Sequence, residues 1–137
     1  MKTLEFYKKN LQEKGIELEA GILKNEEHYF TKLCVAHKLE DAGCVQEAYE
    51  ILRHLYETSA VRFDRHLFAS YEDYLEEKVK YFVSLAQLSY TLTHNPAQSL
   101  PYLDEALITL DGEESAYPYI DRDDIEKLRN KYMNLAV

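Results

Sequence analysis

Residues 71–93, YEDYLEEKVKYFVSLAQLSYTLT, decide the fold, because their apolar side chains recur at helical spacing. Ser70 and Asp73 resemble a capping box with Asp in place of the usual Glu, and Asn95-Pro96 ends the segment. The second half of the segment is apolar on two sides. We therefore expect a long helix that is central and more buried than any other. Its two apolar stripes are Leu75, Val79, Phe82, Ala86 and Tyr90, and Leu85, Leu88 and Leu92.

Helical spacing also dominates the rest of the chain, which holds only 4 Gly and 3 Pro and has no lasting strand-like alternation. The sequence therefore predicts an all-α protein of about six helices, folded as a single domain over residues 1–137. The expected helices cover residues 3–14, 26–41, 45–58, 71–93, about 100–110 and about 122–135, with a packed connector at 16–24 and a mixed linker at 59–69.

Polar residues ahead of three expected helices predict their N-caps. Asn25 and Asp121 precede the second and sixth helices. Ser99 is the expected cap of the fifth helix, because Pro101 is tolerated only in a first turn. The faces expected to be buried are Leu4, Tyr7 and Leu11; Val45, Ala48, Leu52 and Leu55; Leu100, Leu103, Leu107 and Leu110; and Ile125, Leu128, Tyr132 and Leu135.

Two helical pairs share a pattern of large and small residues. The first pair lies in VAHKLEDAGCVQEAYEILRHL, residues 35–55, and the second spans residues 86–106. Both pairs resemble tetratricopeptide-type helical hairpins, and this resemblance implies a protein-binding scaffold without catalysis. The residues that carry it are Val35, Ala36, Leu39, Ala48, Leu52 and Leu55 in the first pair, and Ala86, Tyr90, Ser99, Leu103 and Ala106 in the second.

The two pairs also depart from the tetratricopeptide pattern. Leu39 and Tyr90 are 51 residues apart, whereas regular repeats recur every ~34 residues. Gln87 stands where a small residue is expected, and neither pair ends in the usual proline. An irregular antiparallel helical bundle is the alternative architecture.

The composition limits the functions open to this chain. Its net charge is −9 and its pI about 5.0, which argues against sequence-independent nucleic-acid binding and against attraction to an anionic membrane. No apolar run approaches the ~18–20 residues of a membrane span. The charged N-terminus does not resemble a signal peptide, and two cysteines make no disulfide framework, so we expect a cytoplasmic protein. Cys34 and Cys44 are expected to be small core residues.

Negative charge is concentrated between residues 104 and 126. This window holds nine acids and one base, a net −8 out of −9 for the whole chain. A negative field around exposed aromatic residues suits a surface that binds a basic protein. Tyr117 and Tyr119 flank Pro118 inside it, although these rings could instead fold back over the core. The predicted partner-binding residues are Asp111, Glu113, Glu114, Tyr117, Tyr119, Asp121, Asp123 and Asp124.

Three functions follow from these patterns. DGEESAYPYIDRDD, residues 111–124, is similar to the loop by which small acidic immunity proteins block nuclease toxins. The leading hypothesis is therefore a non-enzymatic inhibitor or immunity-type protein that covers a basic partner surface, such as that of a toxin domain. The alternative is a tetratricopeptide-like adaptor or secretion chaperone that holds a peptide in a helical groove. The third hypothesis is a small helical metalloenzyme.

The metalloenzyme hypothesis depends on two His/Glu pairs. His37 and Glu40 are three residues apart, as are His54 and Glu57, so helical spacing places each pair on one face. Di-iron bundles use the reverse order, Glu before His, with further inward glutamates. We therefore expect exposed histidines, no metal and no cofactor. No nucleophile motif points to an active site, and Cys34 near His37 is expected to be inert.

Overall fold

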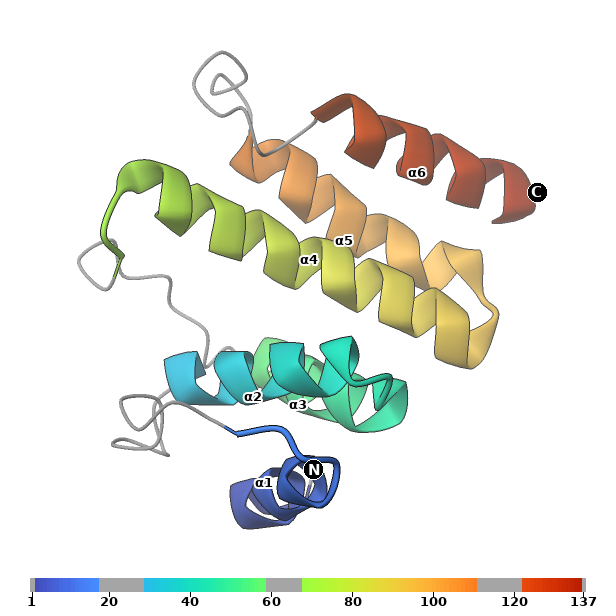
Figure 1. The fold of residues 1–137 in the computed structure, drawn as a ribbon. Helices are drawn as coiled ribbons and strands as arrows, with labels where there is room; N and C mark the ends of the chain where they lie inside the picture. The colour runs from blue at the N-terminus through green and yellow to red at the C-terminus, as the bar shows by residue number, and fades with distance from the viewer. Residues whose placement is uncertain (1, 18–28, 59–67, 111–121, 137) are drawn as a thin grey trace. The chain divides into compact units, whose positions relative to one another are not determined.

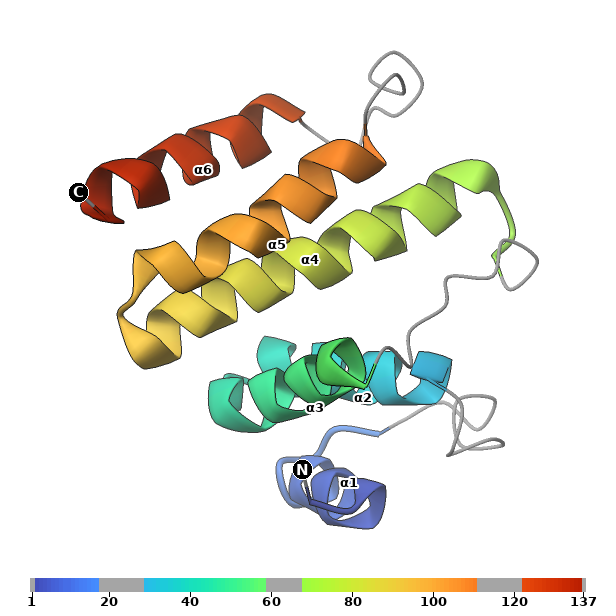
Figure 2. The same ribbon diagram turned by 180° about the vertical axis from the view of Figure 1, so that it is seen from behind.

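The computed structural model is all-helical (Figures 1 and 2) and describes residues 2–17, 29–58, 68–110 and 122–136. Within these ranges there are six helices and no strand, which confirms the predicted fold class. The helices are α1 (Leu4–Glu13), α2 (Tyr29–Asp41), α3 (Val45–Glu57), α4 (Tyr71–Thr93), α5 (Pro96–Thr109) and α6 (Arg122–Ala136). The expected caps Asn25 and Asp121 lie outside the described residues, as does most of the connector and of the linker.

The chain divides into two compact units. The N-terminal unit, Met1–Arg62, contains α1 to α3, and the C-terminal unit, Phe63–Val137, contains α4 to α6. Each unit contributes its own set of buried apolar residues. The expectation that residues 1–137 fold as a single domain stays a prediction.

In the N-terminal unit, α2 and α3 pack together as a hairpin. Gly43 turns the chain with a φ of 82°, a conformation that favours glycine, and the Cys44 amide donates to the Leu39 carbonyl over 2.8 Å. Ala36, Leu39 and Ala48 are fully buried. The predicted face of α3 is buried at Ala48, Leu52 and Leu55 and half-buried at Val45, and Tyr49 and Ile51 extend it.

Tyr7 joins α1 to α3 through hydrogen bonds. Its side chain is fully buried; the hydroxyl accepts from the Lys2 amide at 3.0 Å and donates to Glu50 of α3 at 2.9 Å. Asn10, one turn along α1, donates to Glu47 of α3 at 3.0 Å. Burial raises the pKa of the Tyr7 hydroxyl to about 12, and the neighbouring Glu50 carboxylate adds to the shift.

The C-terminal unit begins with α4, whose predicted cap is confirmed because the Ser70 hydroxyl accepts from the Asp73 amide at 3.1 Å. Nine residues of α4 are buried, and six of them belong to the two predicted stripes. Tyr81, Ser84 and Ser89 are buried outside the stripes, whereas Tyr90 and Leu92, which were predicted to be buried, are half-buried. The prediction placed this helix at the centre of the structure. Within the C-terminal unit, however, α5 is the helix that packs against both of the others (Figures 1 and 2).

The start of α5 corrects the prediction for Ser99. The N-cap is Asn95, whose side chain accepts from the Ala97 amide at 3.2 Å, and Pro96 is the first helical residue. Proline is well suited to that position, so the helix begins four residues earlier than expected. Pro101 consequently lies inside the helix, where its missing amide leaves the carbonyl of the exposed Ala97 to water.

Ser99 has a packing role instead of a capping role. Its hydroxyl is fully buried and donates to the Ala86 carbonyl of α4 at 2.6 Å. Ala86 and Ala106 are also fully buried, so small residues lie where the two helices approach. This face draws Tyr102 into the core and leaves Leu100 and Leu107, which were predicted to be buried, half-exposed.

The buried face of α6 is narrower than predicted. Ile125 and Tyr132 are buried, Leu128 is half-buried and Leu135 is 51% exposed. Because α6 packs mainly against α5, only a narrow stripe of its surface is covered. The rings of Tyr132 and Tyr90 of α4 lie 5.0 Å apart between centroids, and burial raises the pKa of Tyr132.

We expect Ser99→Ala to lower the free energy of unfolding by about 1 kcal/mol, because it removes a buried hydrogen bond between two helices. Thr91→Ala is the matched control, since Thr91 makes a similar bond to the Gln87 carbonyl at 2.9 Å on the exposed side of α4. Chemical denaturation measures both. If Ser99→Ala were as stable as the wild type, the hydrogen bond would contribute nothing to stability, and only the small size of Ser99 would be important for helix packing.

Tyr7→Phe is expected to cost about 1 kcal/mol at neutral pH through loss of the bond to Glu50. This difference should shrink in alkali. The pKa of the Tyr7 hydroxyl is 10.0 in the unfolded chain and about 12 in the folded chain. Between these two values the unfolded wild type loses a proton that the folded protein keeps, so rising pH favours unfolding. The phenylalanine variant has no such proton and is not affected in this way. Denaturation at about pH 9 and about pH 11 tests this. Exposed Tyr56→Phe is the control, and an unchanged gap at both pH values would contradict the expectation.

Candidate functional site

The structure describes two of the eight predicted partner-binding residues. Asp123 and Asp124 lie in the first turn of α6, and both are exposed. Carboxylates are favoured at a helix N-terminus, so these acids also stabilise α6. The other six lie outside the described residues and stay predictions: Asp111, Glu113, Glu114, Tyr117, Tyr119 and Asp121.

Ion pairs engage two other acids of the window. Arg122 pairs with Glu126 one turn along α6 at 3.1 Å. Arg129, which comes after the window in sequence, pairs with Asp104 and so joins α6 to α5. The sequence could not predict the second pair, because it depends on how two helices align. Glu105 and Asp124 are exposed and add to the negative field.

The helix arrangement brings distant acids to one end of the C-terminal unit. In Figures 1 and 2, α4, α5 and α6 lie side by side with alternating directions. The N-terminal ends of α4 and α6 therefore lie at the same end of the unit as the C-terminal end of α5. Exposed acids occur in all three segments, at Glu72 and Asp73, at Glu105, and at Asp123 and Asp124.

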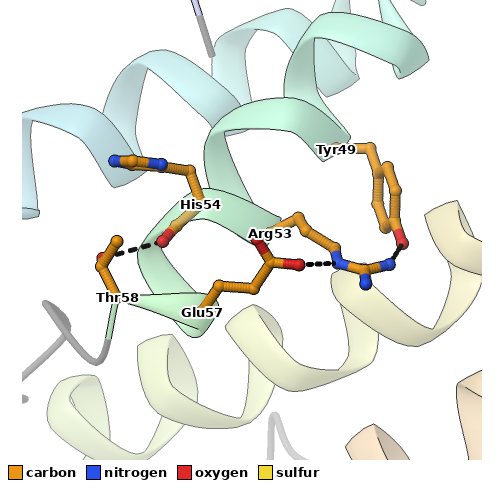
Figure 3. Close-up of polar contacts among 5 residues, drawn as sticks. All are labelled: Tyr49, Arg53, His54, Glu57 and Thr58. Atoms are coloured by element: carbon orange, nitrogen blue, oxygen red, sulfur yellow. Dashed lines mark hydrogen bonds and ion pairs between the residues drawn. The ribbon is translucent and has the colours of Figure 1, made fainter.

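A second polar cluster lies on α3 (Figure 3). Arg53 donates to the Tyr49 hydroxyl at 2.7 Å and to the Glu57 carboxylate at 2.7 Å. An open hollow of about 310 Å³ runs along this face and is lined by Gln46, Tyr49, Glu50, Arg53, His54 and Glu57. The Arg53 guanidinium is already bonded to Tyr49 and Glu57. We therefore interpret the cluster as a surface ion pair that stabilises α3.

The His54/Glu57 pair does not form the arrangement that its spacing suggested. Figure 3 shows the His54 ring and the Glu57 carboxylate directed away from each other, and Glu57 is bound by Arg53. His37 was expected at the surface but is only 9% exposed. α2 packs against both α1 and α3, and two neighbours cover more of a helix than one. Among the described residues, no group of three or more His, Cys, Asp or Glu side chains could hold a metal ion.

The cysteines are less buried than expected. Cys34 in α2 and Cys44 at the start of α3 are both half-buried, whereas the sequence predicted core positions. Leu33 and Val35, on either side of Cys34, are buried. The difference arises because Cys34 lies at the margin of the buried face of α2.

Comparisons with known proteins assign no relative: no family model, no curated protein and no solved structure matches the chain. In the part of the chain that the structure describes, no helix combines the length and the apolar character that a membrane crossing requires.

We expect added Zn²⁺ to leave the stability of the protein nearly unchanged, and equally so in His54→Ala. The reason is that the His54 ring points away from Glu57, which is paired with Arg53 at 2.7 Å. Thermal unfolding with and without the metal, together with elemental analysis of purified protein, tests this. Stabilisation by zinc that disappears in His54→Ala would contradict it.

Proposed function

We propose that this protein is a non-enzymatic binding module that uses its acidic residues between 104 and 126 to hold a basic protein partner. The observation that carries the proposal is the charge distribution, since this window accounts for a net −8 of the total −9. Charge concentrated in one segment produces a directional field, whereas the same charge spread over the surface would not.

The most concrete form of this function is inhibition. A basic groove that binds nucleic acid, such as the substrate groove of a nuclease toxin, presents the complementary charge. An acidic protein placed over that groove would exclude the substrate. The acids would speed the encounter, and Tyr117 and Tyr119 would supply affinity once desolvated. Such an inhibitor would act in the cytoplasm, beside the partner as it is made.

The C-terminal unit supports this proposal through its geometry. The exposed acids of α4, α5 and α6 gather at one end of that unit. The Asp104–Arg129 pair links α6, which carries Asp123 and Asp124, to α5. An acidic end held on packed helices loses little entropy when a partner binds.

A second candidate function is a tetratricopeptide-like adaptor or secretion chaperone. The observation that favours it is the burial of the residues that carried the resemblance. Ala36, Leu39 and Ala48 are fully buried in the first hairpin, as are Ser99 and Leu103 in the second. This is how small and large residues pack in hairpins of that type. A groove that holds a peptide would be the expected binding surface.

Charge reversal tests the leading function. With a partner captured by pull-down, Glu113→Lys, Glu114→Lys and Asp123→Lys together should slow association and weaken its dependence on salt. The matched control reverses three exposed acids of the N-terminal unit, Glu5, Glu13 and Glu17, which changes the net charge equally. Binding kinetics at two salt concentrations separate local from overall charge. If both variants slowed association equally, the effect would come from the overall net charge, and the acidic window would have no specific role in binding.

Tyrosine replacement tests the source of affinity. We expect Tyr117→Ala or Tyr119→Ala to speed dissociation by an amount equivalent to about 2 kcal/mol, with little change in association rate. Circular dichroism checks that each variant remains folded. A partner whose dissociation is unchanged in both variants binds elsewhere, and the groove of the adaptor hypothesis becomes the surface to examine.

A further inference from the structure

Three aromatic rings gather at the start of α4. The rings of Tyr71 and Tyr74 are stacked, with centroids 5.8 Å apart and an interplanar angle of 17°. Phe68 meets Tyr74 edge-on at 5.8 Å and 73°. Tyr71 remains 40% exposed, while Tyr74 and Phe68 are half-buried. We call these three residues the α4 aromatic cluster.

Helix formation accounts for only part of the α4 aromatic cluster. Ser70 caps the helix, and Glu72 and Asp73 complement its dipole, so the polar residues of the first turn already have a structural role. The contact of Phe68 with Tyr74 resembles the apolar contact that fixes the entry of the chain into a helix. The stacking of Tyr71 on Tyr74 is not part of such a contact, and aromatic residues are only moderate helix formers. Because Tyr71 is 40% exposed, part of this aromatic pair is accessible to a partner.

The charges around the cluster select a cationic ligand. Glu72, Asp73 and Glu76 are exposed on the same turns of α4. The Lys78 ammonium lies 6.0 Å from the centroid of the Tyr74 ring, so a cation already occupies the neighbourhood of one ring. A cation over a π face with carboxylates beside it gains from both the ring quadrupole and the negative charge.

The cluster lies on the part of α4 that extends past α5, where Leu75 and Val79 are nonetheless buried. α4 has 23 residues and α5 has 14, and they are joined at the C-terminal end of α4. At 1.5 Å per residue, the N-terminal part of α4 extends about 14 Å beyond the end of α5. It also lies at the end of the unit where Asp123 and Asp124 begin α6 (Figures 1 and 2).

We propose that Tyr71 and Tyr74, with the acids of the same turns, form a docking surface for arginine side chains of a basic protein. A guanidinium is planar, stacks on an aromatic ring and can bind a carboxylate with two parallel bonds, whereas the lysine ammonium acts as a point charge. The inference rests on the proposed function for its class of partner, a basic protein. It adds a second contact outside the window and a preference for arginine over lysine.

Two peptides of equal charge test the preference. Nona-arginine and nona-lysine are titrated against the full chain, with binding followed by the ring-proton shifts of the tyrosines. We expect nona-arginine to bind about two- to fivefold more tightly and to shift Tyr71 and Tyr74. Tyr71→Leu with Tyr74→Leu should abolish the preference, and Tyr56→Leu, at a tyrosine 38% exposed on α3, should retain it.

The controls separate this proposal from the proposed function. Equal affinity for the two peptides, or a preference that survives the double leucine variant, would overturn the docking surface. If the double variant does not fold, unshifted Tyr71 and Tyr74 signals in the wild type overturn it equally. The triple variant Glu113→Lys, Glu114→Lys and Asp123→Lys should weaken the binding of both peptides to the same extent and leave the preference for arginine intact. If the preference persists but this reversal has no effect, the docking surface stands and the acidic window loses its role.

Discussion

The close approach of α4 and α5 is the constraint on which the C-terminal unit depends. Ser99 and Ala86 are fully buried and meet through a 2.6 Å hydrogen bond from hydroxyl to carbonyl. A larger residue at either position would separate the helices. α6 packs on α5 in turn and is linked to it by the Asp104–Arg129 pair. The acids at one end of the unit are therefore carried on α5 and on the two helices that pack against it.

Features set by neighbouring residues were predictable from the sequence. The bounds of α4 agree with the prediction, and Ser70 caps it as expected, because both capping and apolar period act within a turn or two. The prediction for the start of α5 was wrong because it depended on a contact with another helix. Ser99 is a favourable cap by type, but Asn95 and Pro96 are a stronger start, and the close contact with Ala86 gives the serine another partner.

Burial and pairing depended on contacts that local pattern does not contain. Leu135 continues the apolar period of α6 yet is 51% exposed, since that helix is covered mainly from one direction. His37 was predicted to be exposed and is buried, because α2 is covered by two helices. Arg129 reaches Asp104 from another helix. The acidic window itself was visible because charge is a property of composition, independent of packing.

The acids at this end of the C-terminal unit do not contribute equally to the negative electrostatic field around it. The N-terminal ends of α4 and α6 each carry roughly half a positive charge from aligned peptide dipoles. First-turn acids such as Asp73 and Asp124 are partly offset by those dipoles, and Asp104 is offset by Arg129. The field that reaches a partner therefore comes mainly from acids with no such role in folding. Glu105 is one of these in the described structure, and the window at residues 111–121 holds four more by sequence. Steering would depend on those residues, and the first-turn acids would chiefly hold the helices that position them.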